Sequence, residues 1–420
     1  MHADASSSAG LRRVIEIVLA VMTAAAALQV FLALQHAPLV FDEVFHFERI
    51  EGLLRGTMRL QDWGVMLPGY HLFIAGMLRL SGFASVPAAR FVTFLVSVAC
   101  CAAAFSVAFS LDRKSALLRT LQVATLPILL PFFPLLYTDT LSLCILLFAT
   151  FAALRGWALL SGVLLLAAVG VRQNNVLWVP LLFAIVLGRE TTWQIVPTEL
   201  SEWLHESAAR LRAHRSRSVF VRVSLPFLLP VAAFVTFVLV TGRASLNPVL
   251  AASHPFPSFS LGNVFTALSI FAALFLPLVC ARVRSIAELL VRRRWVLIGI
   301  AALFFLFFIG FRVNHPANSD PAYFRDAVLL AAAAGGLPGL LFFLASALAL
   351  LTMIVTPLMR RSFVLLYPLA LLYLGGSWLI DIRYAIVPLV LFLLFRKALS
   401  WRMELLQLLF NFVLCLWVFL

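Results

Sequence analysis

Two adjacent acids, Asp42 and Glu43, directly follow the first long apolar stretch of the chain, in the segment Phe41-Asp-Glu-Val-Phe-His46. A carboxylate at the edge of a membrane is costly unless it is solvated, paired or used by the protein. If it is used, it can take a proton from a hydroxyl group as a general base. The alternative is a solvated helix cap with Asp42 as the N-cap residue, and the pair alone leaves both interpretations open.

Polar groups at the ends of other apolar stretches are expected on the same side of the membrane as Asp42. They lie in Tyr137-Thr138-Asp139, Arg172-Gln173-Asn174-Asn175, His254-Pro255, Asn314-His315-Pro316, Asn318-Ser319-Asp320 and Asp381-Ile382-Arg383-Tyr384. Arginine is depleted on the outer side of membrane proteins, so Arg172 and Arg383 indicate either pairing with an acid or binding of an anion such as phosphate. A structural salt bridge, for example between Asp381 and Arg383, is the simpler alternative.

The same residues do not favour a metal site. Asp42 and His46 are four residues apart and would share one face of a helix, but there is no HExxH motif and the other outward histidines lie on distant segments. His71 is expected to be an interfacial residue. A glycine-rich phosphate loop and a GxSxG motif are both absent from the sequence, which argues against a nucleotide-driven enzyme and a serine hydrolase. We therefore expect no metal and no cofactor.

The elements that carry these residues are expected to be membrane-spanning helices. Of the 420 residues, 63% are hydrophobic and 12% are charged, which exceeds the apolar content of an ordinary water-soluble domain. Continuous apolar runs such as 13–34, 91–111 and 295–311 suit helices that cross a hydrocarbon core of about 30 Å. The first run is interpreted as a retained span and the five cysteines as packing residues. The net charge of +14 is spread over short connections, so nucleic acid is not an expected partner.

The distribution of arginine and lysine orients the chain. If Arg12 and Arg13 are cytoplasmic, alternating loops place most other basic residues, Arg119 and Arg396 among them, on the cytoplasmic side. The result is an all-α polytopic membrane protein with about 12–14 transmembrane helices. The whole chain, 1–420, is expected to form one membrane domain. Residues 36–90 would form a long first luminal or periplasmic loop with interfacial helices, and residues 189–222 a cytoplasmic amphipathic insert that anchors the chain.

One reaction that these groups suit is the transfer of a sugar from a polyprenyl phosphate to an alcohol. A carboxylate can accept the hydroxyl proton while arginines stabilise the departing phosphate. If a single base acts and no nucleophile intervenes, the anomeric carbon inverts. A transporter or a flippase for lipid-linked sugars is the alternative, since charged groups near spans also mark substrate paths.

The order of several short motifs resembles the membrane glycosyltransferases of the GT-C type, and within them the dolichyl-phosphate-glucose α-1,2-glucosyltransferases that add the terminal glucose to the lipid-linked N-glycan precursor. The motifs are Asp42-Glu43-x-Phe45-His46, Trp63 with Leu67-Pro68-Gly69-Tyr70, Arg90-Phe91-Val92, Tyr137-Thr138-Asp139, Arg172-Gln173-x-Asn175 and Arg383-Tyr384 with Pro388. One departure follows His315-Pro316, where the family pattern has an Asp and then an Arg-His pair. This chain keeps Asp320 without that pair, so its donor or acceptor can differ.

The resemblance implies a GT-C type bundle and a role for each matched residue. It makes Asp42 the general base, with Glu43 and His46 orienting it or the acceptor. Arg172 and Arg383 would hold the donor phosphate, with His315 as a helper, and Asp139 and Asp320 would bind sugar hydroxyls. The further substrate-binding residues expected are Trp63, Tyr70, Gln173, Asn175, His254 and Tyr384.

The expected activity is therefore that of an inverting glycosyltransferase in the membrane. Its donor would be a hexose, with glucose expected, on a polyprenyl or dolichyl phosphate, and its acceptor a hydroxyl of a lipid-linked oligosaccharide or another glycan. The site would face the lumen of the endoplasmic reticulum in a eukaryote or the periplasm in a bacterium, where the carrier would be undecaprenyl. Membrane lipids are the other expected partners.

Overall fold

The computed structural model describes residues 2–59, 62–190, 214–247 and 258–419. In these ranges the chain is helical, with no β-strand beyond an isolated bridge between Leu358 and Arg396, so the all-α prediction is confirmed. The α-helices are α1 (His2–Leu34), α2 (Asp42–Arg55), α3 (Gly69–Ser81), α4 (Val86–Leu111), α5 (Ala116–Ala124), α6 (Thr138–Arg155), α7 (Ala158–Val171), α8 (Val179–Glu190), α10 (His214–Thr241), α11 (Gly262–Leu274), α12 (Leu276–Arg292), α13 (Trp295–Gly310), α14 (Phe324–Ala333), α15 (Gly336–Val355), α16 (Leu366–Gly375), α17 (Ile386–Phe395) and α18 (Trp401–Phe419). Short 3-10 helices join them: η2 (Leu130–Phe132), η3 (Gln173–Trp178), η5 (Pro316–Asn318), η6 (Arg361–Leu365) and η7 (Ile382–Ala385).

Several helices are long and apolar enough to cross a membrane. Within the described ranges there are five, namely Gly10–Leu34, Val86–Leu111, Thr138–Arg155, Ser218–Thr241 and Gly336–Val355, and the bent pair α11 and α12 can make a sixth. Shorter apolar segments are Ala158–Val171, Trp295–Gly310, Arg361–Gly375 and Ile382–Phe395. The chain is a polytopic membrane protein. Among the described residues, fewer long spans occur than the 12–14 expected for the whole chain, and four apolar helices there are shorter.

The bend between α11 and α12 is 97°, and a side chain from another helix supports it. Inside a membrane, a backbone carbonyl that loses its helical partner must find another donor. Leu274 ends α11, and its carbonyl accepts a hydrogen bond of 2.7 Å from Nε2 of Gln407 on α18. The bend is therefore a stable part of the fold.

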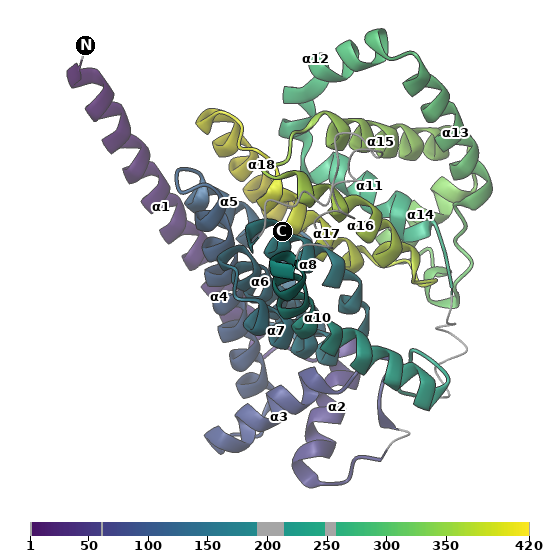
Figure 1. The fold of residues 1–420 in the computed structure, drawn as a ribbon. Helices are drawn as coiled ribbons and strands as arrows, with labels where there is room; N and C mark the ends of the chain where they lie inside the picture. Colours follow the sequence, from purple (N-terminus) through teal and green to yellow (C-terminus); the bar gives the residue numbers. More distant parts are fainter. Residues whose placement is uncertain (1, 60–61, 191–213, 248–257, 420) are drawn as a thin grey trace.

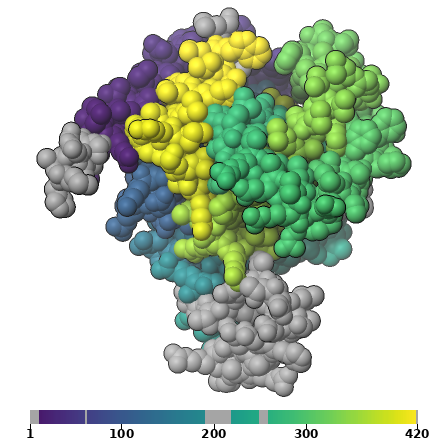
Figure 2. All heavy atoms as spheres, turned by 90° about the horizontal axis from the view of Figure 1, so that it is seen from above, coloured from purple at the N-terminus to yellow at the C-terminus, as the bar shows by residue number. Residues whose placement is uncertain are grey.

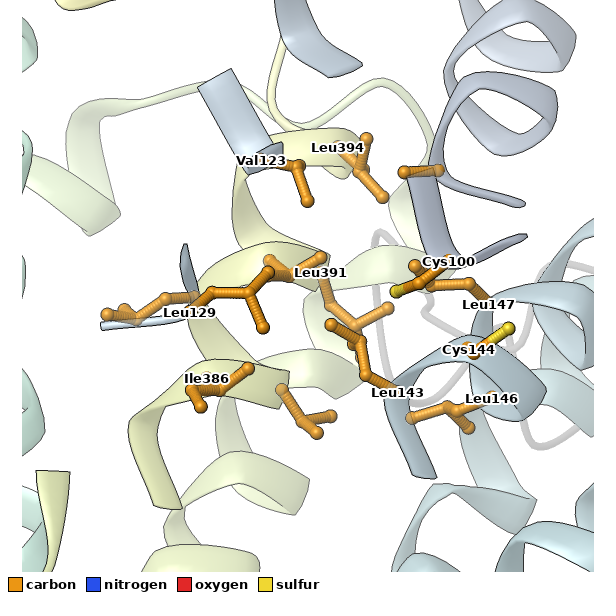
Figure 3. Close-up of a cluster of buried hydrophobic side chains, with 14 of the residues drawn as sticks. Cys100, Val123, Leu129, Leu143, Cys144, Leu146, Leu147, Ile386, Leu391 and Leu394 are labelled. Atoms are coloured by element: carbon orange, nitrogen blue, oxygen red, sulfur yellow. The ribbon is translucent and has the colours of Figure 1, made fainter. Parts of the chain in front are cut away.

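The main core surrounds α17, whose ten residues are all buried. Figure 3 shows Ile386, Leu391 and Leu394 of this helix near Cys100 and other side chains of α4, α5 and α6. A helix buried on every side brings the groups at both of its ends into the interior as well. The prediction that cysteines pack in the core is right for Cys100, Cys144 and Cys415, whereas Cys280 is exposed on the surface.

The first span stands at the edge of the molecule, and its N-terminal part projects away from the other helices (Figure 1). Figure 2 shows it beside the C-terminal segment, and Leu19 of α1 packs in one cluster with Leu118 and Leu408. Trp401 Nε1 also donates a hydrogen bond of 2.9 Å to Glu16. Most other side chains of the span are exposed, as expected where lipid covers a helix.

The first loop folds into α2 and α3, which pack against each other at one end of the bundle (Figure 1). Helix α3 has 13 residues, too few to cross a membrane. It buries Ile74 and Leu78 and exposes Leu72 and Leu80, so its outer face is apolar, as in an interfacial helix. The side of the membrane on which this loop lies stays a prediction. Most of the amphipathic insert predicted over 189–222 lies outside the described residues.

Candidate active site

Asp42 is the first residue of α2, and its carboxylate is half-exposed at 45%. The preceding residue, Phe41, has φ 49° and ψ −122°, and it provides no side-chain cap for the helix. A positive φ is strained for a non-glycine residue, and such strain occurs preferentially at functional sites. The interpretation of Asp42 as an N-cap is wrong, because the residue lies inside the helix. Its Oδ2 instead lies 3.0 Å from Nη2 of Arg383.

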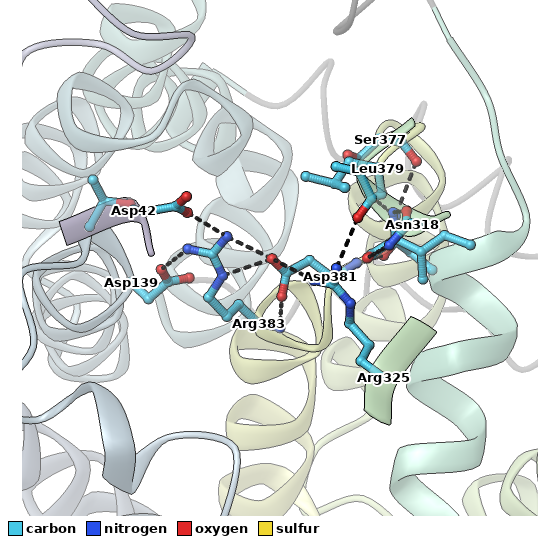
Figure 4. Close-up of polar contacts among 12 residues, drawn as sticks. Asp42, Asp139, Asn318, Arg325, Ser377, Leu379, Asp381 and Arg383 are labelled. Atoms are coloured by element: carbon cyan, nitrogen blue, oxygen red, sulfur yellow. Dashed lines mark hydrogen bonds and ion pairs between the residues drawn. The ribbon is translucent and has the colours of Figure 1, made fainter. Parts of the chain in front are cut away.

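Arg383 contacts both Asp42 and residues from the C-terminal part of the chain (Figure 4). Its Nε and Nη2 donate to Oδ2 of Asp381 at 2.9 and 2.6 Å, and its Nη1 lies 3.9 Å from Oδ2 of Asp139. The guanidinium also lies over the ring of Tyr137, 4.9 Å from its centroid. Burial acts to raise the pKa of Asp381, but the adjacent Arg383 outweighs it and leaves the pKa lowered. The predicted pairing of Arg383 with Asp381 is therefore present.

Arg172 and Asp139 form a second buried ion pair beside the first. Asp139 lies in the first turn of α6 and Arg172 directly follows α7, so each charge opposes the partial charge of its helix end. Burial acts to lower the pKa of Arg172, but Asp139 outweighs it and raises the pKa. Arg172 also lies over the ring of Tyr384, 5.6 Å from its centroid. Its Nη2 and Oδ2 of Asp139 are buried without a hydrogen bond.

Glu43 is fully buried and anchors the start of α2. Its carboxylate accepts hydrogen bonds from Arg90 Nε (3.0 Å) and Nη2 (2.5 Å), Val40 N–H (3.1 Å) and Leu136 N–H (2.9 Å). Arg90 also donates to the carbonyls of Leu34, Ala37 and Pro38, just after the first span. Its oxygens are thus occupied within the protein, and the catalytic role predicted for Glu43 stays a prediction.

His46 and His71 form a buried pair, with His46 Nδ1 2.9 Å from His71 Nε2. Burial lowers the pKa of His71 to about 3 and that of His46 well below its usual value, with a further lowering of the latter by His71 and Arg49. Both imidazoles are thus neutral near pH 7. The interfacial position expected for His71 is wrong, since it packs inside the protein between Trp63 and Tyr70.

Other predicted site residues support the loops around this cluster. Gln173 donates to the carbonyls of Val65 and Ala244 at 3.1 and 2.9 Å and so joins two loops. Asn175 is fully buried and donates to Ser142 and Ala168, and buried Tyr70 lies 3.4 Å from Thr93. Both side chains are buried, and the substrate contacts predicted for Tyr70 and Asn175 stay predictions.

Three further site residues were predicted in later loops, and the structure describes two of them. His315 is buried, accepts the N–H of Ala317 at 3.1 Å and packs against Trp378. Asp320 is exposed and accepts the N–H of Ala322 within a turn. His254 lies outside the described residues.

Two charged residues that the sequence analysis missed lie beside the cluster. Arg325 Nε donates to Asp326 at 2.7 Å, and its Nη1 lies 3.9 Å from Oδ2 of Asp381. Asp326 is fully buried and accepts from Asn318 Nδ2 at 3.2 Å. The available signal was the Arg-Asp dipeptide ten residues after His315. Within the described part of the chain no group of three metal-ligating side chains occurs.

Comparison with known proteins places this geometry in a family. A model of the DIE2/ALG10 family matches residues 36–318, which is more than half of the chain. The chain belongs to the DIE2/ALG10 family. The family match includes Asp42, Asp139 and Arg172 but ends before Arg325 and Arg383.

A curated relative is the rat (Rattus norvegicus) Dol-P-Glc:Glc(2)Man(9)GlcNAc(2)-PP-Dol alpha-1,2-glucosyltransferase, 25% identical over 300 residues. The alignment covers 60% of this chain and 61% of the relative. The chain thus spans less than two thirds of that relative's length. No solved structure matches the chain.

Proposed function

We propose that this protein is an inverting glycosyltransferase that moves glucose from a polyprenyl phosphate to a hydroxyl of a lipid-linked oligosaccharide. The observation that carries the proposal is the half-exposed carboxylate of Asp42, held 3.0 Å from Arg383 and directly after the strained residue Phe41. Membership of the DIE2/ALG10 family and the activity named for the rat relative support the reaction class. For that relative, the name gives dolichyl phosphate glucose as donor and a dolichol-linked oligosaccharide as acceptor.

The proposed step is a single displacement at the anomeric carbon of the glucose. The acceptor oxygen forms a bond to that carbon as its bond to the phosphate oxygen breaks. The electron pair of the broken bond leaves with the polyprenyl phosphate, and Asp42 takes the proton of the acceptor hydroxyl. With one displacement and no covalent intermediate, the configuration inverts.

The surroundings of Asp42 suit this role. A general base must be ionised before the reaction and reachable by a hydroxyl group. Asp42 lies beside the guanidinium of Arg383, and the exposure of its side chain leaves room for an acceptor. Glu43 and Arg90 hold α2 in position, so the carboxylate is presented from a fixed backbone.

The assay that tests the proposal uses purified protein in vesicles with labelled polyprenyl-phosphate hexoses and a lipid-linked oligosaccharide. We expect transfer of glucose, with the anomeric configuration opposite to that of the donor. Uptake of the labelled lipid or sugar without transfer would instead establish a transporter or a flippase.

The proposed side of the membrane is luminal or periplasmic, and cysteine labelling tests it. In a variant without Cys280, the exposed position Asp62 should react with an impermeant thiol reagent from that side after Asp62→Cys. A cysteine introduced by Lys114→Cys should react only from the cytoplasmic side. The reverse pattern would invert the topology and the location of the site.

A further inference from the structure

We propose that Phe41 and Tyr323 form an aromatic platform that binds a sugar ring of the acceptor glycan beside Asp42. The inference rests on the transfer reaction proposed above, and it names two residues that select the acceptor. The centroids of the two rings lie 6.1 Å apart, with 63° between the ring planes, which is an ordinary edge-to-face arrangement of aromatic side chains.

Both rings are exposed although they are large and apolar. Phe41 is 69% exposed and Tyr323 is 50% exposed. Single exposed apolar side chains are common on protein surfaces, but these two come from distant parts of the chain and meet at the surface. They meet next to Asp42, which follows Phe41 directly and has a side chain 45% exposed. The rings and the proposed base therefore share one accessible surface.

A sugar ring matches both properties of this surface. Its hydroxyl groups lie around its edge and can donate a hydrogen bond to a carboxylate. Its C–H groups lie on its faces and pack favourably against an aromatic ring, because the face of an aromatic ring is electronegative. An acceptor hydroxyl that reaches Asp42 brings its own sugar ring to the platform.

The position of the platform favours the acceptor over the donor. In a single displacement, the base and the leaving group lie on opposite sides of the anomeric carbon. Asp42 is the proposed base, so the sugar next to it is the one that gives up its hydroxyl proton. Phe41 is the neighbour of Asp42 in the chain and is thus on the side of the acceptor.

The acids around the platform favour a glycan over lipid tails. Asp42 adjoins Phe41, and Asp320, which is also exposed, lies three residues before Tyr323. A carboxylate in hydrocarbon is costly, so a surface flanked by two exposed carboxylates is expected to face water. A glycan can pack on the rings and still donate hydrogen bonds to these acids, whereas a lipid tail cannot.

The backbone of Phe41 is fixed by the buried contacts of α2. Glu43 accepts the N–H of Val40 at 3.1 Å and two hydrogen bonds from Arg90. Arg90 also donates to the carbonyl of Ala37 at 2.7 Å. The strained residue Phe41, with φ 49°, is therefore held from both sides.

The backbone of Tyr323 is fixed as well. Its N–H donates to the carbonyl of Asp320 at 3.2 Å. Two residues later, Arg325 donates to the carbonyl of Ala317 at 3.1 Å and to the buried carboxylate of Asp326 at 2.7 Å. Rings presented from fixed backbone lose little conformational entropy when a ligand binds, which favours affinity.

Kinetics of the acceptor test the platform. Phe41→Leu and Tyr323→Leu each keep an apolar side chain but remove the ring, and each should raise KM for the lipid-linked oligosaccharide about 10-fold. The kcat and the KM for the donor should stay unchanged, because Asp42 and Arg383 remain in place. Tyr323→Phe keeps the ring and should have the wild-type KM. A rise in KM for the donor instead of the acceptor would overturn the inference.

The matched control is Phe83→Leu. Phe83 is also 69% exposed and follows the end of α3 in the same loop between the first two spans. If exposed aromatic side chains of this loop only anchor it in the membrane, Phe83→Leu should have the same effect as Phe41→Leu. We expect the wild-type KM for the acceptor, and an equal rise in this control would contradict the platform.

Binding of the oligosaccharide released from the lipid-linked acceptor tests the platform without turnover, donor or lipid. The two leucine variants should bind this oligosaccharide about 10-fold more weakly than the wild type, and Tyr323→Phe should bind it equally well. Wild-type affinity in both folded leucine variants would overturn the inference, whatever happens to kcat. If the wild type binds the oligosaccharide through the two rings but transfers no sugar, the proposed function fails and the platform stands.

Discussion

The two ends of α17 carry buried charged groups that are built differently. Before its first residue, Arg383 contacts Asp42, Asp139 and Asp381, and one of these acids is half-exposed. After its last residue, Arg396 pairs with Glu404 on α18 through two contacts of 2.7 Å. Arg396 and Glu404 are almost completely buried. One end leaves a carboxylate accessible, and the other end leaves none.

The cluster around Arg396 and Glu404 is buried and joins three helices. Besides Arg396, Glu404 accepts hydrogen bonds from Gln122 Nε2 (2.9 Å) and Leu399 N–H (2.7 Å). Arg119 of α5 donates to the carbonyls of Leu394 and Arg396 at 2.8 and 2.6 Å. These contacts fasten the end of α17 to α5 and α18. The comparison shows that burial of an arginine does not by itself mark a functional site, and that an accessible carboxylate beside it is the feature that differs.

The largest expected effect is a loss of activity at the Arg383 end of α17. Asp42→Asn should lower kcat about 10³-fold, because the amide cannot accept the acceptor proton, while the free energy of unfolding changes little. The measurement is transfer from a labelled polyprenyl-phosphate glucose, with a thermal unfolding curve for each variant.

The control for Asp42→Asn lies on the same helix. Glu51→Gln removes an acid with a side chain 43% exposed, paired with Arg55 in the next turn, and it should keep near wild-type transfer. Near wild-type transfer by Asp42→Asn itself would exclude this residue as the base.

Removal of a charge at the closed end should affect stability instead. Glu404→Leu leaves Arg396 buried without its partner and should lower the free energy of unfolding by about 3 kcal/mol. The protein that remains folded should transfer sugar at the wild-type rate. Adding Arg396→Met removes the unpaired charge and should recover much of the loss. A stable Glu404→Leu variant without activity would contradict the division between the two ends.

The sequence predicted the membrane helices and the polar groups around Asp42 more fully than those around Arg396. Apolar length and composition predicted that helices cross the membrane, although fewer long spans occur among the described residues than were expected. Short motifs identified Asp42, Asp139, Arg172 and Arg383. Arg119 and Arg396 were taken for loop charges because the charge rule counts residues and does not register burial. The anchoring role of Glu43 was missed for a related reason. Its partner Arg90 is 47 residues away, and such a pairing is set by helix packing.

A pH-dependent loss of stability is expected from the buried histidine pair. The folded protein keeps His46 and His71 neutral, whereas the unfolded chain binds protons below about pH 6.5. Stability is therefore complete above that pH and falls as the pH is lowered, by about 1.4 kcal/mol per pH unit for each imidazole. Unfolding curves between pH 7 and 5 measure the slope. His71→Phe should reduce it by about half, and an unchanged slope would exclude the pair as its origin.

The smallest expected effect concerns the backbone in front of Asp42. Phe41 has φ 49° and a side chain that is 69% exposed, so Phe41→Gly removes strain at little cost in buried surface. It should raise the free energy of unfolding by about 1 kcal/mol. Phe45→Gly is the matched control, because Phe45 is 55% exposed but lies inside α2, and it should lower stability by about 1 kcal/mol.

Activity decides whether the strain at Phe41 contributes to the site. If the strained turn holds Asp42 against Arg383, the more stable Phe41→Gly variant should have a lower kcat and an unchanged KM for the donor. A gain in stability without loss of kcat would assign the strain to the packing of the loop alone. The other end of α17 differs in this respect. There, the buried side-chain contacts between Arg396 and Glu404 hold the structure.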